Sequence, residues 1–213
     1  MNFKKKNDVS LKVGGNLSYQ GNFHAGYAFS NHLAFITELT NSEMPLPQSK
    51  YEEEKDNAYI WNNEFIYYNN INNKLLPAVN VGFSYGNLAN NIEYFDLNMY
   101  RYYIQPSLGY FQEHVEVAIS TRFSKLHYDF IQQKDFVNES GISLYEYYDL
   151  RDAGKTDFYF IEPAISLGLR YNNFTLKYQI INNIKISSGD IYYKKKADFI
   201  SLIFTFNIDE LSK

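Results

Sequence analysis

The sequence predicts an all-β fold, an antiparallel up-and-down transmembrane β-barrel of about ten strands, with eight strands as the alternative. Three observations support this prediction. Apolar and polar residues alternate with a period of two from Val9 to Ile208, which is the pattern of strands with one apolar face. Aromatic residues make up 18% of the 213 residues, with 21 Tyr and 17 Phe, and aromatic side chains favour strands. Short turns and long polar loops also alternate along the chain, as in outer-membrane barrels.

The alternation defines ten segments, each bounded by polar or Asn-rich stretches. The expected strands are Asp8–Gly15, Gly21–Phe29, His32–Thr40, Ala58–Tyr68, Leu75–Asn87, Met99–Phe111, Val115–Asp129, Asp157–Tyr171, Phe174–Ser187 and Asp198–Ile208. Tight turns are expected at Ser30-Asn31, Asn69–Asn73, Gln112-Glu113 and Asn172-Asn173, and long polar loops at Asn41–Asn57, Leu88–Asn98, Phe130–Thr156 and Ser188–Ala197. All turns then lie at one end, the periplasmic end, with both termini. Residues 1–7 are expected to form an N-terminal periplasmic segment, residues 8–209 the barrel and residues 210–213 a C-terminal tail.

The two faces of the strands differ in a way that indicates which one meets lipid. One face is apolar and almost free of charge, as in Ile161, Ile165, Leu167 and Leu169. The other mixes Gly, Ala and Ser with charged residues, which suits a narrow interior better than a solvent face. The apolar face is therefore expected to meet lipid. The tyrosines expected in the two aromatic girdles are Tyr27, Tyr67, Tyr85, Tyr110 and Tyr171.

A soluble β-sandwich or a soluble barrel that carries an apolar ligand would also show alternation. Pro77, Pro106 and Pro163 fall inside expected strands, although a closed barrel has no edge strand on which proline could be placed. Bulges or positions close to turns would accommodate them.

Composition excludes several other classes. The formal net charge of −4 with scattered lysines argues against nucleic acid as a partner. The chain has no Cys, which excludes disulfides, thiolate catalysis and Cys-ligated metals. No apolar run approaches 18 residues, so a helical membrane span is not expected. Residues 1–7 lack the apolar stretch of a signal peptide, and an exported chain whose signal lies outside this sequence is the expectation.

Several segments also resemble a known group of proteins. Residues Asp8–Thr40 (DVSLKVGGNLSYQGNFHAGYAFSNHLAFITELT) resemble the opening of small outer-membrane β-barrel proteins of the Bacteroidetes, many of which look like lipoproteins. Arg101–Tyr110 (RYYIQPSLGY) and Phe160–Leu169 (FIEPAISLGL) resemble paired strands of that family, and Phe199–Ile208 (FISLIFTFNI) is similar to its last strand. Because such proteins are mostly uncharacterised, the resemblance implies the fold and the outer membrane of a Gram-negative bacterium.

The residues with possible chemistry fall into three groups. The expected lumen network, read as structural ion pairs, comprises Lys12, Glu38, Glu64, Gln105, Glu116, Arg122, Glu162, Arg170, Lys177 and Lys185. The four histidines have no metal-ligand spacing, and His127 with Ser124 and Asp129 is a loose candidate for a catalytic group. The long loop Phe130–Thr156 offers aromatic residues typical of binding surfaces, namely Phe136, Tyr145, Tyr147 and Tyr148.

The sequence therefore predicts a non-enzymatic, porin-like outer-membrane barrel with a filled polar lumen. Its extracellular loops would act as a scaffold or partner-binding surface. No catalytic residue, metal or cofactor is expected. The expected partners are outer-membrane lipid and, through the extracellular loops, another envelope protein. The alternatives are an outer-membrane lipid-modifying enzyme and a soluble carrier of an apolar ligand.

Overall fold

The fold is known from a computed structural model that describes residues 3, 5–16, 20–44, 56–72, 74–89, 95–133, 156–188 and 195–211. The strands are β1 (Asp8–Asn16), β2 (Gln20–Ala28), β3 (Leu33–Met44), β4 (Asp56–Tyr68), β5 (Leu75–Ala89), β6 (Phe95–Gln112), β7 (Val115–Gln133), β8 (Phe158–Tyr171), β9 (Phe174–Asn182), β10 (Ile184–Lys185) and β11 (Lys196–Asn207). A short helix, α2 (Ile208–Leu211), follows β11. Among the described residues no helix is both long and apolar enough to cross a membrane.

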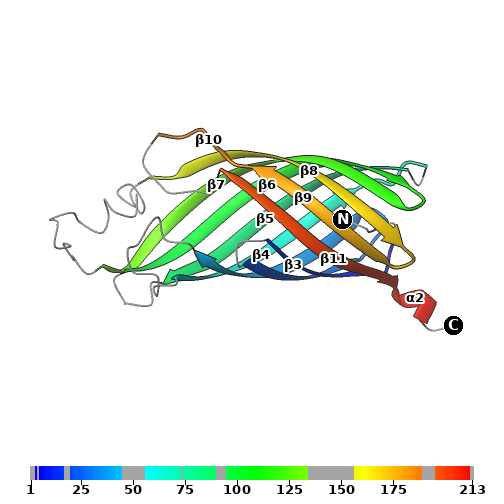
Figure 1. The fold of residues 1–213 in the computed structure, drawn as a ribbon, viewed down its shortest axis with the longest axis horizontal. Coiled ribbons are helices and arrows are strands. Elements are labelled where there is room, and N and C mark those ends of the chain that lie inside the picture. The colour runs from blue at the N-terminus through cyan, green and yellow to red at the C-terminus, as the bar shows by residue number, and fades with distance from the viewer. Residues whose placement is uncertain are drawn as a thin grey trace.

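The strands close into a barrel in which each strand is antiparallel to its neighbours (Figure 1). β11 pairs with β1 on one side and with β9 on the other, and β8 pairs with β9. β10 continues β9 after Asn183 and pairs with the same strand, β8. Counted with β9 as one interrupted strand, the described strands number ten. The predicted fold class is therefore confirmed, and the alternative of eight strands is wrong.

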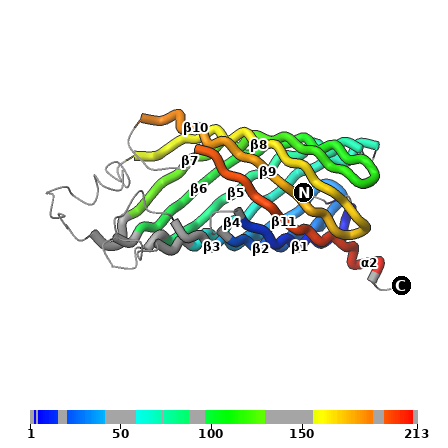
Figure 2. The backbone as a smooth tube through the Cα atoms, in the orientation of Figure 1, coloured from blue at the N-terminus to red at the C-terminus, as the bar shows by residue number. Residues whose placement is uncertain are grey.

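The short turns and helix α2 lie at one end of the barrel, and the described strand ends that lead into the long connections lie at the other (Figure 2). Two of the tight turns contain an Asn with positive φ, Asn72 and Asn172, and Asn7, just before β1, also has positive φ. Asn is tolerated better than most residues in this conformation. The wall is uneven, because β6 and β7 have 18 and 19 residues while β1 and β2 have 9 each. The β6–β7 side consequently extends further toward the long connections.

Pro106 on β6 and Pro163 on β8 lie on either side of Thr121 of β7. Both are next to gaps in the ladder of paired backbone residues. Between Ile104 and Ser107 the β6–β7 ladder skips Pro106 without a change of register. Pro163 is opposite Thr121 on one side, and on the other it faces the break between β9 and β10. Pro77 lies close to a turn, and its carbonyl accepts a hydrogen bond from the Asn69 amide at 3.0 Å. Proline is thus placed where a ladder donor is not needed.

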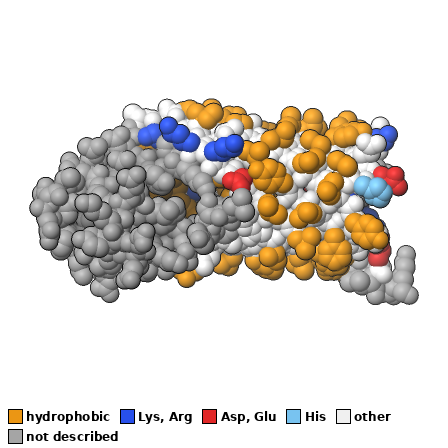
Figure 3. All heavy atoms as spheres, viewed as in Figure 1, with side chains coloured by type: hydrophobic (Ala, Val, Ile, Leu, Met, Phe, Trp, Pro, Cys, Tyr) orange, Lys and Arg blue, Asp and Glu red, His pale blue; other side chains and the backbone are white. Residues whose placement is uncertain are grey.

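Side chains alternate between the outside of the barrel and its lumen. On β8, Ile165 and Leu167 are 52% and 51% exposed, while Ser166 between them is 6% exposed. Apolar side chains cover the outer surface of the barrel away from its ends (Figure 3). Tyr27, Tyr67, Tyr85, Tyr110 and Tyr171 are all exposed on this outer face. The exterior is thus a band suited to lipid. Four of these tyrosines lie near the short turns, and Tyr85 lies toward the opposite end.

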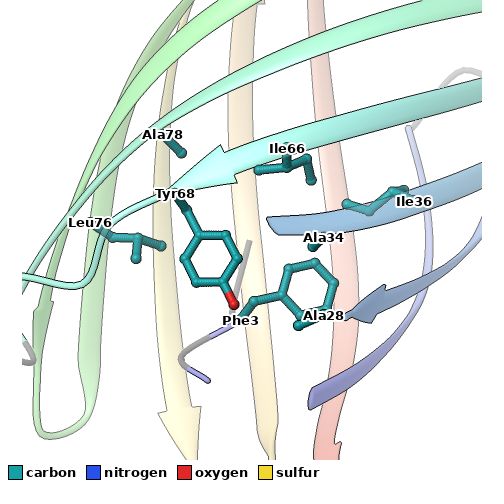
Figure 4. Packing of buried hydrophobic residues seen from close by; sticks show 8 residues of the cluster. All are labelled: Phe3, Ala28, Ala34, Ile36, Ile66, Tyr68, Leu76 and Ala78. Carbon is teal, nitrogen blue, oxygen red and sulfur yellow. The ribbon is translucent and has the colours of Figure 1, made fainter. Parts of the chain in front are cut away.

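The lumen carries apolar clusters toward both of its ends. The base cluster, near the short turns, consists of Phe3, Ala28, Ala34, Ile36, Ile66, Tyr68, Leu76 and Ala78. Phe3 lies inside the barrel beside Tyr68 (Figure 4), with ring centroids 6.2 Å apart. The upper cluster, nearer the long connections, consists of the buried inward residues Leu97, Met99, Leu126, Tyr128, Phe158 and Phe160. Arg101 on β6 and Glu162 on β8 follow the upper-cluster residues Met99 and Phe160 toward the short turns. Glu64 on β4 precedes the base-cluster residue Ile66.

Candidate functional site

The candidate site is the lumen, where four carboxylates each lie next to a cation. Lys12 Nζ is 2.5 Å from Glu38 Oε2, and Lys177 Nζ is 3.2 Å from Glu116 Oε1. Arg122 Nη2 is 4.0 Å from Glu64 Oε1, and Arg101 forms an ion pair with Glu162. Four positive and four negative charges therefore compensate one another inside the wall. Ion pairs of this kind remove the cost of a buried unpaired charge.

Hydrogen bonds fix the central pair, Glu64 with Arg122. Glu64 accepts hydrogen bonds from Asn80 Nδ2 and from the Tyr103 hydroxyl, both at 2.7 Å. Arg122 Nε donates to Gln105 Oε1 at 2.8 Å, and its guanidinium carbon lies 4.3 Å from the centre of the Tyr103 ring. Tyr103 thus contacts both members of the pair. The arrangement holds these side chains in one geometry rather than leaving them open to a ligand.

Small inward residues provide the room for these groups. A Cβ placed on Gly82 would lie 2.2 Å from Cζ of Tyr103, and one placed on Gly168 would lie 2.4 Å from Cγ of Glu116. Each large side chain therefore crosses a glycine on the neighbouring strand. The Gly residues of the polar face serve this close approach.

Arg170 and Lys185 contact aromatic rings. The Arg170 guanidinium carbon is 5.6 Å from the centre of the Phe111 ring, and Lys185 Nζ is 5.9 Å from that of Phe158. Arg170 also lines a cavity of about 430 Å³ at the short-turn end. Lys5, Asp8 and Glu210 line the same cavity, together with Asn70, Asn172, Asn173, Thr175, Thr205, Phe206 and Asn207. Lys5 and Arg170 balance the carboxylates of Asp8 and Glu210, so the lining carries no net formal charge.

The histidines do not form a catalytic group with Ser124. His127 faces outward between Asp129 and Asp157, with 3.0 Å from each imidazole nitrogen to a carboxylate oxygen. Ser124 faces the lumen, where Arg101 Nη2 donates to its hydroxyl at 3.0 Å. The suggested grouping of His127 with Ser124 is therefore wrong, because the two side chains lie on opposite faces of β7. Within the described ranges no cluster of three or more metal-ligating side chains is present.

Several inward residues of the lumen were not in the predicted network, among them Arg101, Tyr103 and His24. His24 Nδ1 lies 3.8 Å from Glu38 Oε2. Arg101 and Tyr103 have the same parity as Gln105 on β6, so counting back by twos from Gln105 would have found them. The predicted binding residues Phe136, Tyr145, Tyr147 and Tyr148 lie outside the described residues.

Several solved structures of outer-membrane proteins are similar to this chain. No family model matches the sequence, and no curated protein matches it. Among solved structures, the N-terminal β-barrel domain of Pseudomonas aeruginosa OprF is 10% identical, with a TM-score of 0.39, over 95% of this chain and 99% of that one. The KdgM porin, in complex with disordered oligogalacturonate, is 12% identical, with a TM-score of 0.38, over 94% and 99%. The outer membrane enzyme PagL is 10% identical, with a TM-score of 0.34, over 94% and 99%.

The geometry of the chain itself gives its environment. A closed antiparallel barrel with short turns at one end, an apolar exterior and a charged interior is the architecture of outer-membrane proteins. The chain is an outer-membrane β-barrel protein of Gram-negative type.

Proposed function

We propose that the protein is a non-enzymatic, non-conducting barrel that anchors extracellular loops as a scaffold or partner-binding surface. The observation that carries this proposal is the filled lumen, in which ion pairs lie between two apolar clusters. A barrel of about this strand number has little interior volume beyond its side chains. A membrane-embedded wall and a filled interior leave the loops as the main surface for recognition.

Two alternatives have less support. A lipid-modifying enzyme would need catalytic groups that converge on one substrate, whereas His127 and Ser124 lie on opposite faces of the wall. A soluble carrier would hold its apolar face inside, but here that face is outside. Membership of the small Bacteroidetes barrels is part of the proposal, and its support is the sequence resemblance.

The closed lumen is tested by electrical recording of the purified protein in planar lipid bilayers. We expect no large, steady single-channel current, because the central ion pairs block the path. A stable open conductance would overturn the non-conducting part of the proposal and favour a porin.

The role of the loops is tested by a deletion in the longest one. Residues Asp135 to Asp152 would be replaced by a short Gly-Ser linker, which leaves every described strand intact. We expect the variant to fold in lipid vesicles but to lose partners captured by crosslinking on whole cells. A second variant keeps the loop at full length and changes only its aromatic residues to Ser, namely Phe136, Tyr145, Tyr147 and Tyr148. If both variants retain every partner, this loop is not the binding surface.

A further inference from the structure

The side-chain amide of Asn63 lies in the middle of the lipid-facing surface. On β4 the outward residues are Tyr59, Trp61, Asn63, Phe65 and Tyr67, and the four aromatic ones are each at least 50% exposed. Asn63 is four residues from each of the two tyrosines, which is about 13 Å along the strand in either direction. Its amide is therefore near the centre of the apolar band.

The neighbours of Asn63 leave its amide without a hydrogen bond among the described residues. The register places Asn63 beside Thr37 on β3 and Phe83 on β5. Trp61 Nε1 donates to Thr37 Oγ1 at 2.7 Å, so the indole and the hydroxyl are joined to each other. Phe83 has no polar atom in its side chain. The Asn63 side chain is partly exposed on this surface.

An unpaired amide is unfavourable at this depth. The hydrocarbon core contains no water, so polar groups there must find partners within protein. Side-chain amides that face lipid are therefore expected where another protein segment covers them. A threonine, Thr121 on β7, also faces outward, but its single hydroxyl has fewer unmet hydrogen bonds than an amide.

We infer that the outer face of β3, β4 and β5 around Asn63 is the contact surface between two copies of this chain in the membrane. A carboxamide is self-complementary, because Nδ2 donates and Oδ1 accepts. Across a twofold axis, two Asn63 side chains satisfy each other with reciprocal hydrogen bonds, as an isologous interface requires. A purely apolar neighbour such as a lipid chain cannot do this.

The surroundings of Asn63 supply contact area. Tyr59, Trp61, Phe65 and Tyr67 are joined by Leu39 on β3 and Val81 on β5, which are 54% and 55% exposed. Six side chains that are about half exposed offer on the order of 600 Å², which approaches the roughly 800 Å² per partner of a specific interface. Aromatic side chains around a central hydrogen bond are typical of interface centres.

Cysteine crosslinking tests the contact directly, because the chain has no Cys of its own. The full-length Phe65→Cys variant keeps the Asn63 amide, and its cysteine faces outward on β4 two residues from it. It would be placed in phospholipid vesicles and treated with a short bis-maleimide crosslinker. Ile165→Cys on β8, which is outward and 52% exposed, is the matched control away from β3–β5. We expect the covalently linked dimer to form at least tenfold faster in Phe65→Cys.

A second variant separates the contact from folding. Asn63→Leu keeps the size of the side chain and removes the amide, so it should fold at least as well as the natural chain in lipid. Its dimer fraction, counted by single-molecule photobleaching in vesicles, should fall at least tenfold. Equal crosslinking rates at positions 65 and 165, or an unchanged dimer fraction in Asn63→Leu, would overturn the inference. Crosslinking of Phe65→Cys to a different protein in native membranes, in place of a second copy, would overturn it as well.

Discussion

The ring of Tyr103 on β6 lies directly over Gly82 on β5, and the Tyr103 hydroxyl donates to Glu64 on the far side of that glycine. This close approach leaves no room for a side chain at position 82. The geometry of the central ion pair, Glu64 with Arg122, therefore depends on a glycine at position 82.

Gly82→Ala should therefore destabilise the barrel by about 1 to 3 kcal/mol, since the new methyl group overpacks a site already filled by the ring. Urea unfolding in lipid vesicles, followed by tryptophan fluorescence, measures the change. Gly21→Ala on β2 is the matched control, because a Cβ there meets nothing within 4 Å. If both variants unfold at the same urea concentration, the ring does not require a glycine.

The strand order and the direction of each face were predictable from sequence. A period of two fixes which residues share a face, and Asn-rich turns fix the antiparallel order. Ile165 and Ser166 lie on the faces that the alternation predicts.

The partners inside the lumen were not predictable in the same way. Arg101 and Glu162 are 61 residues apart in sequence, and their side chains form an ion pair across β7, the strand between β6 and β8. Alternation tells which side chains point inward, but not which of them meet across the lumen. The burial of Phe3 was missed for a different reason, because it lies outside any strand and carries no periodic signal. The upper apolar cluster was missed because only polar and charged residues were expected in the lumen network.

Glu162→Gln should weaken the barrel by about 3 kcal/mol, because it leaves the Arg101 guanidinium in the lumen without its carboxylate. The free energy of unfolding in vesicles is the measured quantity. Glu210→Gln is the control, since it breaks the exposed ion pair with Lys5 at the surface and should leave stability almost unchanged. Similar losses in the two variants would mean that the lumen pair behaves as a surface pair.

Ile165→Arg should impair assembly, because a cation near the middle of the lipid-facing band costs about 2 to 4 kcal/mol on a barrel. Ser166→Thr, one residue away but facing the lumen, should have a smaller effect. The yield of the heat-modifiable folded form on a gel after insertion into vesicles compares the two. Normal assembly of Ile165→Arg would show that the outer face does not meet lipid.

Acid should weaken a contact near the start of β8. The hydrogen bond from Lys125 Nζ, at 2.7 Å, lowers the pKa of Asp157 below its ordinary value of 3.8, with a smaller contribution from His127. A lowered folded-state pKa means that the stabilisation is present above the ordinary value and is lost as the pH falls through the folded one. The stability of the natural chain should thus fall more steeply below about pH 4 than that of Asp157→Asn. Lys125→Met should also make the stability fall less steeply with pH than in the natural chain. An equal pH dependence in the natural chain, Asp157→Asn and Lys125→Met would contradict the assignment of this effect to the Lys125–Asp157 contact.

Phe3 should act as a plug at the periplasmic base of the barrel. Its side chain is fully buried in the base cluster, and a Cβ on Gly26 would lie 2.7 Å from its ring. The neighbouring backbone is fixed as well, since the Asn7 amide donates to the Ala28 carbonyl at 2.7 Å and Asn207 Nδ2 donates to the Lys6 carbonyl at 2.9 Å.

Phe3→Ala should cost about 3 kcal/mol, because it removes a large buried side chain and opens a cavity in the base cluster. Phe3→Leu refills most of that volume and should recover most of the lost stability. Because the ring holds the segment inside the barrel, Phe3→Ala should also speed hydrogen exchange at the Asn7 amide, while amides in the middle of β6 stay protected. Unchanged exchange at Asn7 together with unchanged stability would mean that the segment is held by its hydrogen bonds and not by the ring.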